Sequence, residues 1–232
     1  MSVAWYDPRI ARGTAQQLTR WHQRLKAGDK AIGWKLGFGT ADALERLKLG
    51  APLVGYLTQE TQLRSGEPVS LAGYTRALAE CEVAVYLGKE VHRGATRDAV
   101  LAAIAGIAPA IEVVDLDASP DDVTAILAGN IYHRHFIVGA RETNRGGLVE
   151  GYSGTIRHNG ESSAVERLHP TGGDYVELVK HVADLLAAFG ERLSAGQVII
   201  TGAVVPPLAV QPGDSLGFKF HNSPEITARF TA

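Results

Sequence analysis

Ala79-Glu80-Cys81-Glu82-Val83-Ala84-Val85-Tyr86 is the stretch that decides the fold, because its apolar and β-branched residues predict a buried strand. Side chains two positions apart on a strand point to the same face. Glu80 and Glu82 therefore project side by side, while the residues between and after them pack behind. The pattern predicts a core strand that carries two carboxylates on one face.

A third carboxylate, Glu112, lies in a second run of the same kind, Pro109–Asp115. Three like charges held against a core are unfavourable unless they are paired, protonated or bound to a metal. Hydrated Mg²⁺ or Mn²⁺ suits all-oxygen ligands and leaves positions open for a substrate. The three glutamates therefore predict a divalent-metal site; the alternative is that they form the solvated face of an ordinary strand pair.

Composition limits the other classes of function. The chain has 232 residues, enough for one large or two small domains, and a net charge of -2, which gives no general electrostatic reason to expect nucleic acid. The one cysteine, Cys81, excludes an internal disulfide framework and is predicted to be a small core residue. The N-terminus lacks the apolar segment of a signal peptide, and no run approaches the roughly 20 apolar residues of a membrane span. We expect a cytoplasmic protein that binds neither nucleic acid nor membrane.

Periodicity predicts helices and short strands in irregular order. The predicted helices are 8–27, 41–49, 96–105, 120–128 and 173–189. The predicted strands include 30–39, which breaks into a glycine-rich turn, the two carboxylate runs, 136–139, 198–202, 216–220 and 226–230, with a hairpin around His158-Asn159-Gly160. Because strands and helices do not alternate regularly, the pattern favours an α+β fold with a mixed sheet.

Two further polar features are ambiguous on sequence alone. Lys35 alternates inside an apolar strand beside a glycine-rich turn, where a lysine indicates either an anionic partner or an edge-strand surface position. His133 and His135 form an H-x-H pair that could bind a metal. With no third histidine or cysteine nearby, we interpret them instead as polar residues at a helix end or in a loop.

An ordered set of short motifs extends through most of the chain. The motifs are Gly33–Gly37, Pro52–Leu57, Glu80–Glu82, Pro109–Asp115, Asn130, Gly139, Asn159-Gly160, His169-Pro170, Gly196–Gly202 and Pro212–Asp214. In this order they resemble the 2-hydroxypentadienoate hydratase and 4-oxalocrotonate decarboxylase group of the fumarylacetoacetate hydrolase superfamily. The resemblance covers nearly the whole chain from about residue 30.

The resemblance implies the architecture and the metal site. We expect an α+β fold with a mixed β-roll of the fumarylacetoacetate hydrolase type. A small N-terminal helical portion, 1–55, would lead into a catalytic β-roll domain, 56–232. Glu80, Glu82 and Glu112 resemble the metal ligands of the group, holding Mg²⁺ or Mn²⁺ at the mouth of the roll. Lys35 resembles its active-site lysine.

The resemblance also implies a function. It predicts a metal-dependent hydratase, a lyase of aromatic-compound catabolism, that acts on a short unsaturated 2-oxo or 2-hydroxydienoic acid chelated through its 1-carboxylate and 2-oxo oxygens. The substrate-binding residues implied are Leu57, Asn130 and Thr201. We expect a homo-oligomer that can associate with a related enzyme of the pathway.

Departures from the pattern keep other functions open. Gln59-Glu60 stands where the hydratases carry two aspartates, so Glu60 is the candidate for their proton-transfer role; Gly129 and Leu116-Asp117 also differ from the group. One alternative is a decarboxylase of 2-oxo-enedioates. Another is a carbon–carbon bond hydrolase of diketo acids, for which His22, His133 and His135 are the candidate bases. The third is a non-catalytic partner subunit that keeps the fold.

Overall fold

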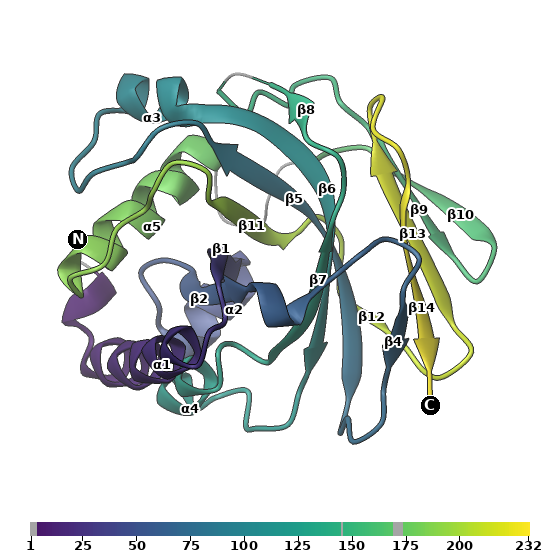
Figure 1. Ribbon diagram of the computed structural model, residues 1–232, viewed down its shortest axis with the longest axis horizontal. Helices are drawn as coiled ribbons and strands as arrows, with labels where there is room; N and C mark the ends of the chain where they lie inside the picture. Colours follow the sequence, from purple (N-terminus) through teal and green to yellow (C-terminus); the bar gives the residue numbers. More distant parts are fainter. Residues whose placement is uncertain (1–3, 145, 169–173) are drawn as a thin grey trace.

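The computed structural model describes residues 4–144, 146–168 and 174–232 (Figure 1); the motif His169-Pro170 lies outside them. The helices are η1 (Ala4–Tyr6), α1 (Pro8–Lys26), α2 (Ala41–Leu47), η2 (Gln59–Thr61), α3 (Arg97–Ala103), α4 (Val123–Ala128) and α5 (Tyr175–Ala188). The strands are β1 (Ala31–Gly37), β2 (Leu53–Thr58), β3 (Gln62–Leu63), β4 (Pro68–Ser70), β5 (Ala77–Leu87), β6 (Ile104–Asp115), β7 (His133–Val138), β8 (Glu142–Thr143), β9 (Gly154–His158), β10 (Glu161–Val165), β11 (Val198–Ala203), β12 (Leu208–Ala209), β13 (Ser215–Phe220) and β14 (Ile226–Thr231).

Two mixed sheets form the framework. The larger follows the order β2-β1-β11-β5-β6-β7-β3, with β12 on β5 and β8 on β6, and the smaller follows β10-β9-β13-β14-β4. In the larger sheet β1 runs parallel to β11, whereas β5 and β6 are antiparallel. Figure 1 shows the long, curved β5 and β6 in the middle, with the smaller sheet on one side and α1 and α5 on the other. This arrangement is the mixed α+β fold that the sequence predicts.

The long strand β5 separates two packing environments, as its alternation predicts. Cys81 and Val83 face the main core, which includes the inner side of the smaller sheet. The opposite face looks into the curl of the larger sheet, where Ala84 packs with Leu57 and Phe136. The prediction for Cys81 is confirmed: the residue is buried, and burial raises the pKa of its thiol to about 12, with the charges of the neighbouring glutamates adding to the shift.

Most predicted elements are confirmed within a few residues, and the hairpin turn at Asn159-Gly160 has the two positive φ angles, 52° and 87°, of a type I′ turn. The exception is the H-x-H segment. The strand predicted from Phe136 begins at His133, where it pairs with Val114 of β6, so the interpretation of His133 and His135 as helix-end or loop residues is wrong. Both histidines belong to β7 because pairing with β6 extends that strand toward its N-terminus.

Two further predictions concern the division of the chain into two portions and the lack of a membrane span. The division at residue 55 stays a prediction. Within the described ranges, none of the helices combines the length and apolar character that crossing a bilayer requires.

The segment between α4 and β7 forms a strained corner. Asn130, Ile131 and Tyr132 all have left-handed backbone angles, with φ of 61°, 55° and 61°. Such angles are unfavourable for β-branched and aromatic residues unless the surroundings enforce them. The buried Asn130 amide supplies that enforcement: its Oδ1 accepts a hydrogen bond from the Tyr56 backbone N–H at 2.9 Å, and its Nδ2 donates to the Tyr56 carbonyl at 3.0 Å.

We expect Asn130→Ala to lower the free energy of unfolding by about 2–4 kcal/mol, because it leaves two buried backbone groups of Tyr56 unpaired. Chemical denaturation monitored by circular dichroism measures the change. Asn130→Gly is the matched control, since glycine tolerates the left-handed angle. If Asn130→Gly restored wild-type stability, the backbone angle and not the amide clamp would be the source of the loss.

Candidate active site

The structure brings the three predicted carboxylates together. Glu80 on β5 lies directly opposite Glu112 on β6, and Glu82 follows on the same face of β5. One oxygen from each of Glu80, Glu82 and Glu112 lies within 4.8 Å of the others. A single divalent cation holds its oxygen ligands roughly 3–5 Å apart, so the three carboxylates fit one ion.

The hydrogen bonds around Glu82 and Glu112 leave one oxygen of each free for a ligand. Glu82 Oε2 accepts from the Gly202 backbone N–H at 2.7 Å, and its Oε1 is buried without a hydrogen-bond partner. Glu112 Oε1 accepts hydrogen bonds from Lys35 and His133, and its Oε2 is buried without a partner. A buried carboxylate oxygen without a partner is unfavourable, and a hard cation satisfies it. The donor set is the all-oxygen kind that Mg²⁺, Mn²⁺ and Ca²⁺ accept.

Lys35 and His133 hold the engaged oxygen of Glu112. Lys35 faces away from the main core on β1, is 1% exposed, and places its Nζ 2.6 Å from Glu112 Oε1 and 3.2 Å from the Ile131 carbonyl. His133 Nδ1 donates to the same Oε1 at 2.6 Å, and its Nε2 lies 3.0 Å from the Thr61 hydroxyl. A buried lysine with a carboxylate partner is the first of the two interpretations that its sequence context allowed.

Gly55 of β2 allows the side chains of Lys35 and Asn130 to pack directly against the β2 backbone. A Cβ atom at Gly55 would lie 2.8 Å from Asn130 Oδ1 and 2.8 Å from Lys35 Cγ. Any side chain there would displace the corner that contains Ile131 or the aliphatic stem of the lysine. The glycine therefore leaves room for the aliphatic stem of Lys35 beside β2.

The carboxylates differ in acidity because their surroundings differ. Burial, reinforced by the charge of Glu112, raises the pKa of Glu80 to about 7, and burial raises the pKa of Glu82 well above its usual value. Burial acts in the same direction on Glu112, but the Lys35 ammonium and the His133 hydrogen bond hold the pKa of Glu112 below its usual value. Without a cation, the cluster therefore keeps protons that a bound metal must displace.

We expect the apparent affinity for Mg²⁺ to rise with pH up to and beyond about 7, by as much as tenfold per pH unit for each proton displaced, because only the ionised carboxylates bind the metal. Titration calorimetry from pH 5.5 to 8.5, in buffers of different ionisation enthalpy, measures both the affinity and the proton release. Glu80→Gln should lower the number of protons released. Affinity that did not change with pH would contradict the assignment.

A cavity of about 500 Å³ opens beside the cluster, with Lys35 and Glu80 in its wall. Its other walls come from the turn after β1, from α2, from the strained corner at Ile131-Tyr132 and from the segment after β11. Thr201, predicted to bind substrate, lines this cavity, although its hydroxyl donates to the Val83 carbonyl at 2.8 Å. The cavity is the place where a small molecule can contact both Glu80 of the carboxylate cluster and Lys35.

Three other predicted site residues lie elsewhere. Leu57 is fully buried inside the curl of the larger sheet, and Asn130 uses both ends of its amide on Tyr56. The Glu60 side chain is 68% exposed on η2 and pairs with Arg24 at 2.7 Å. None of Leu57, Asn130 and Glu60 is among the described residues that line the cavity beside the carboxylates. Their predicted roles in binding and proton transfer therefore gain no support from the geometry and stay predictions.

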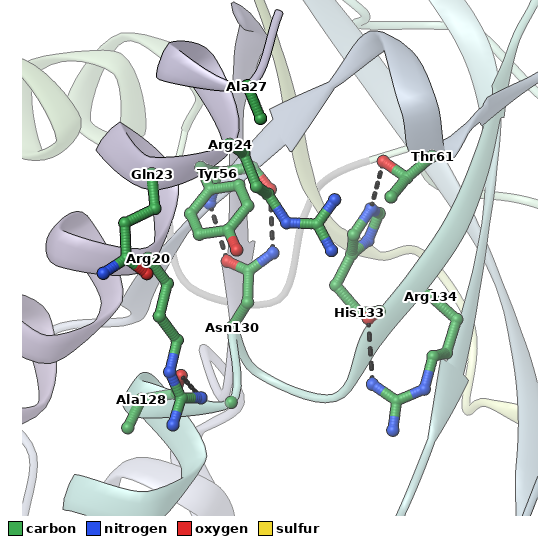
Figure 2. Close-up of a pocket in the computed structure, with 11 residues that line it drawn as sticks. Arg20, Gln23, Arg24, Ala27, Tyr56, Thr61, Ala128, Asn130, His133 and Arg134 are labelled. Atoms are coloured by element: carbon green, nitrogen blue, oxygen red, sulfur yellow. Dashed lines mark hydrogen bonds between the residues drawn. The ribbon is translucent and has the colours of Figure 1, made fainter. Parts of the chain in front are cut away.

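Sequence reasoning missed Thr61, and it did not predict that His133 lies beside the carboxylate cluster. Figure 2 shows both at the edge of a second cavity of about 470 Å³, between α1 and the corner before β7. Three arginines line this second cavity, but each already has a partner: Arg20 donates to the Ala128 carbonyl, Arg24 to Glu60 and Arg134 to Asp117. His133 therefore forms a wall between the second cavity and the carboxylate cluster. The one signal in the sequence was the position of His133 just before the apolar run that begins at Phe136.

The fumarylacetoacetate (FAA) hydrolase C-terminal family model matches residues 22–231. A 4-oxalocrotonate decarboxylase of Pseudomonas sp is 28% identical over 210 residues, covering 86% of this chain and 78% of the relative. A 2-hydroxyhexa-2,4-dienoate hydratase of Comamonas testosteroni is 28% identical over 214 residues, covering 90% and 81%. Among solved structures, 4-oxalocrotonate decarboxylase from Pseudomonas putida G7, complexed with magnesium and adipate, superposes with a TM-score of 0.85 at 24% identity, covering 95% of this chain and 86% of that one.

Proposed function

Since the chain belongs to the fumarylacetoacetate hydrolase family, we propose that it is a divalent-metal-dependent lyase, a hydratase of a short unsaturated 2-oxo or 2-hydroxydienoic acid. The single observation that carries the proposal is the pair of buried, unpartnered oxygens on Glu82 and Glu112 beside a cavity that contains Lys35. Curated relatives that act as hydratases and decarboxylases support it, as does the magnesium in the decarboxylase structure.

Glu80, Glu82 and Glu112 would hold the cation, with Mg²⁺ as the first choice and Mn²⁺ as a second. When bound, a divalent cation supplies a Lewis acid that polarises the oxo group and stabilises charge on its oxygen. The protein supports this chemistry by fixing the Glu82 carboxylate on the Gly202 N–H and the Glu112 carboxylate on Lys35 and His133. These contacts hold the ligands in place before a substrate arrives.

Lys35 is the group best placed to handle protons. An ammonium has three N–H donors, and Lys35 uses two of them on Glu112 and Ile131, so the third is available to a molecule in the cavity. Ketonisation of a 2-hydroxydienoate requires a proton to leave the enol oxygen and another to reach carbon. A fixed cation beside the oxygen stabilises the negative charge that develops between these steps.

A decarboxylase of 2-oxo-enedioates is the second candidate, because its chemistry needs the same polarised oxo group and the relatives include such enzymes. The three candidate bases of the hydrolase alternative are not positioned for that role. His22 is exposed and pairs with Glu191 at 2.8 Å, His133 is engaged by Glu112 and Thr61, and His135 on β7 is not among the described residues lining the cavity beside the carboxylates.

The test is turnover of 2-hydroxypenta-2,4-dienoate, of 2-hydroxyhexa-2,4-dienoate and of a 2-oxo-enedioate by the Mg²⁺-loaded protein, followed by ultraviolet absorbance and product analysis. A 4-hydroxy-2-oxo acid without gas identifies a hydratase, and carbon dioxide from a 2-oxo-enedioate identifies a decarboxylase. If no substrate turns over while oxalate still binds, the chain is a non-catalytic partner subunit, and the proposed activity is wrong.

We also propose that the protein works in the cytoplasm as a homo-oligomer and can associate with a related enzyme of the same pathway. The support is its resemblance to the hydratase and decarboxylase group. Analytical ultracentrifugation of the purified protein measures the oligomeric state, and a monomer at micromolar concentration would contradict the proposal.

A further inference from the structure

The cavity beside the carboxylates has a charged end and an apolar wall. Lys35 and Glu80 mark the charged end. Beyond them the wall consists mainly of aliphatic, aromatic and proline side chains together with backbone, among them Leu78, Val114, Leu116, Ile131 and Val205. A molecule that places its polar head at the glutamates therefore extends the rest of its length along an apolar surface.

Arg46 is the one further charged side chain among the described residues of this wall, and it is already engaged. It belongs to α2, its side chain is 46% exposed, and it forms an ion pair with Asp121 while donating to the Pro120 carbonyl at 3.1 Å. A carboxylate at the far end of a substrate would have to compete with Asp121 for this guanidinium at a solvated site, where ion pairs are weak.

The volume of the cavity also indicates a ligand that extends beyond the charged end. If each heavy atom needs as much room as a water, about 30 Å³, a five-carbon hydroxydienoic acid of roughly eight heavy atoms fills about half of the 500 Å³ cavity. Volumes of this size are usual for ligands larger than a five-carbon acid. The cavity has room for a tail.

We propose that the substrate is a 2-oxo or 2-hydroxydienoic monoacid with an uncharged alkyl or aryl tail, which lies along the apolar wall, and that the cavity selects against a second carboxylate. This inference rests on the proposed function and narrows it toward the hydratase chemistry. Burial of each methylene group strengthens binding by about fourfold. A carboxylate placed against the same wall loses its hydration without gaining a partner.

The test compares ligands of matched length on the Mg²⁺-loaded protein by titration calorimetry: oxalate, 2-oxobutyrate, 2-oxohexanoate and 2-oxoadipate. Oxalate reports on the charged end alone. We expect 2-oxohexanoate, which has two more methylene groups, to bind about fifteenfold more tightly than 2-oxobutyrate, and 2-oxoadipate to bind at least tenfold more weakly than 2-oxohexanoate. The last two ligands have the same number of carbons, so their difference isolates the second carboxylate.

Two variants probe the wall directly. Val205→Arg, on the half-exposed segment after β11, should move the preference toward 2-oxoadipate by tenfold or more. Arg46→Ala should leave the ratio of the two six-carbon ligands unchanged. Thermal melts confirm that each variant is folded, and the ligand series on the wild type stands without them.

Different failures are distinguishable. The inference is overturned if 2-oxoadipate binds as tightly as 2-oxohexanoate. It is also overturned if Arg46→Ala selectively weakens the binding of 2-oxoadipate, because Arg46 then binds the second carboxylate. If oxalate binds but the length of the tail has no effect, the inference fails and the proposed function survives. If neither oxalate nor any 2-oxo acid binds in the presence of Mg²⁺, both are wrong.

Discussion

Glu82→Gln should lower the affinity for Mg²⁺ by about 10²-fold or more. Loss of a residue that only supports a metal ligand typically costs 10–100-fold in affinity, and loss of a ligand costs at least as much. Glutamine can still accept the Gly202 N–H through its amide oxygen, as Glu82 Oε2 does at 2.7 Å. Its NH₂ group then occupies the place of the unpartnered Oε1 and offers no lone pair to a cation.

The stability of the metal-free variant supplies a second signature. Burial raises the pKa of Glu82 well above its usual value, so without metal the surroundings favour the uncharged carboxyl group, of which glutamine is a close mimic. We therefore expect Glu82→Gln to melt no lower than the wild type when metal is absent, and to lose the stabilisation that Mg²⁺ gives the wild type. Calorimetric titration and thermal melts with and without Mg²⁺ measure both effects.

Glu60→Gln is the matched comparison, because Glu60 is exposed and paired with Arg24 on a different element. This variant should bind Mg²⁺ as the wild type does. Its turnover tests the predicted proton-transfer role of Glu60: a large loss of turnover would support that role, and wild-type turnover would contradict it. If Glu82→Gln bound Mg²⁺ as tightly as the wild type, the three-carboxylate site would be wrong.

The metal cluster was predictable because its signal is local. Two glutamates at i and i+2 in an apolar strand, and a third in a similar run, are visible without knowledge of the fold. Their convergence depends on the register that pairs Glu80 with Glu112, and local alternation does not specify that register. The ordered motifs supplied the missing information, since a resemblance carries the pairing along with the residues.

Contacts between distant segments explain what the sequence did not predict. His133 was interpreted as a loop or helix-end residue because two histidines two apart give no sign of burial. Its hydrogen bond to Glu112 exists only because β7 pairs with β6 and the strained corner starts that strand at His133. For Glu60, the predicted role gains no support from the geometry and stays a prediction. The motif around it suggested proton transfer, whereas the short η2 turn directs its side chain to solvent and Arg24.

The structure also decides between the two interpretations of Lys35. Sequence left Lys35 between an edge-strand surface residue and the partner of an anion, because alternation alone does not reveal what lies across the strand. Parallel pairing of β1 with β11 and antiparallel pairing with β2 make its strand an interior one. Burial at 1% exposure then requires a partner, and Glu112 provides it.

Lys35→Met should lower turnover by about 10²-fold or more at saturating Mg²⁺, because it removes the only ammonium among the described residues that line the cavity. Methionine keeps the length and the apolar stem, so the close packing against Gly55 is retained. Steady-state kinetics on whichever dienoate proves to be the substrate, together with calorimetric titration of Mg²⁺, measure turnover and metal affinity separately. Lys89→Met, at an exposed position just after β5, is the control and should leave both unchanged.

Turnover at saturating Mg²⁺ separates two roles for Lys35. The ammonium lies 2.6 Å from a carboxylate that should bind the cation, so its positive charge opposes metal binding while it keeps Glu112 ionised. If Lys35 served only to neutralise buried charge, Lys35→Met would lower the stability of the metal-free protein, and a saturated enzyme would turn over at the wild-type rate. A loss of turnover that persists at saturating Mg²⁺ requires the ammonium in the reaction itself, because under that condition the remaining groups at the site are all in place.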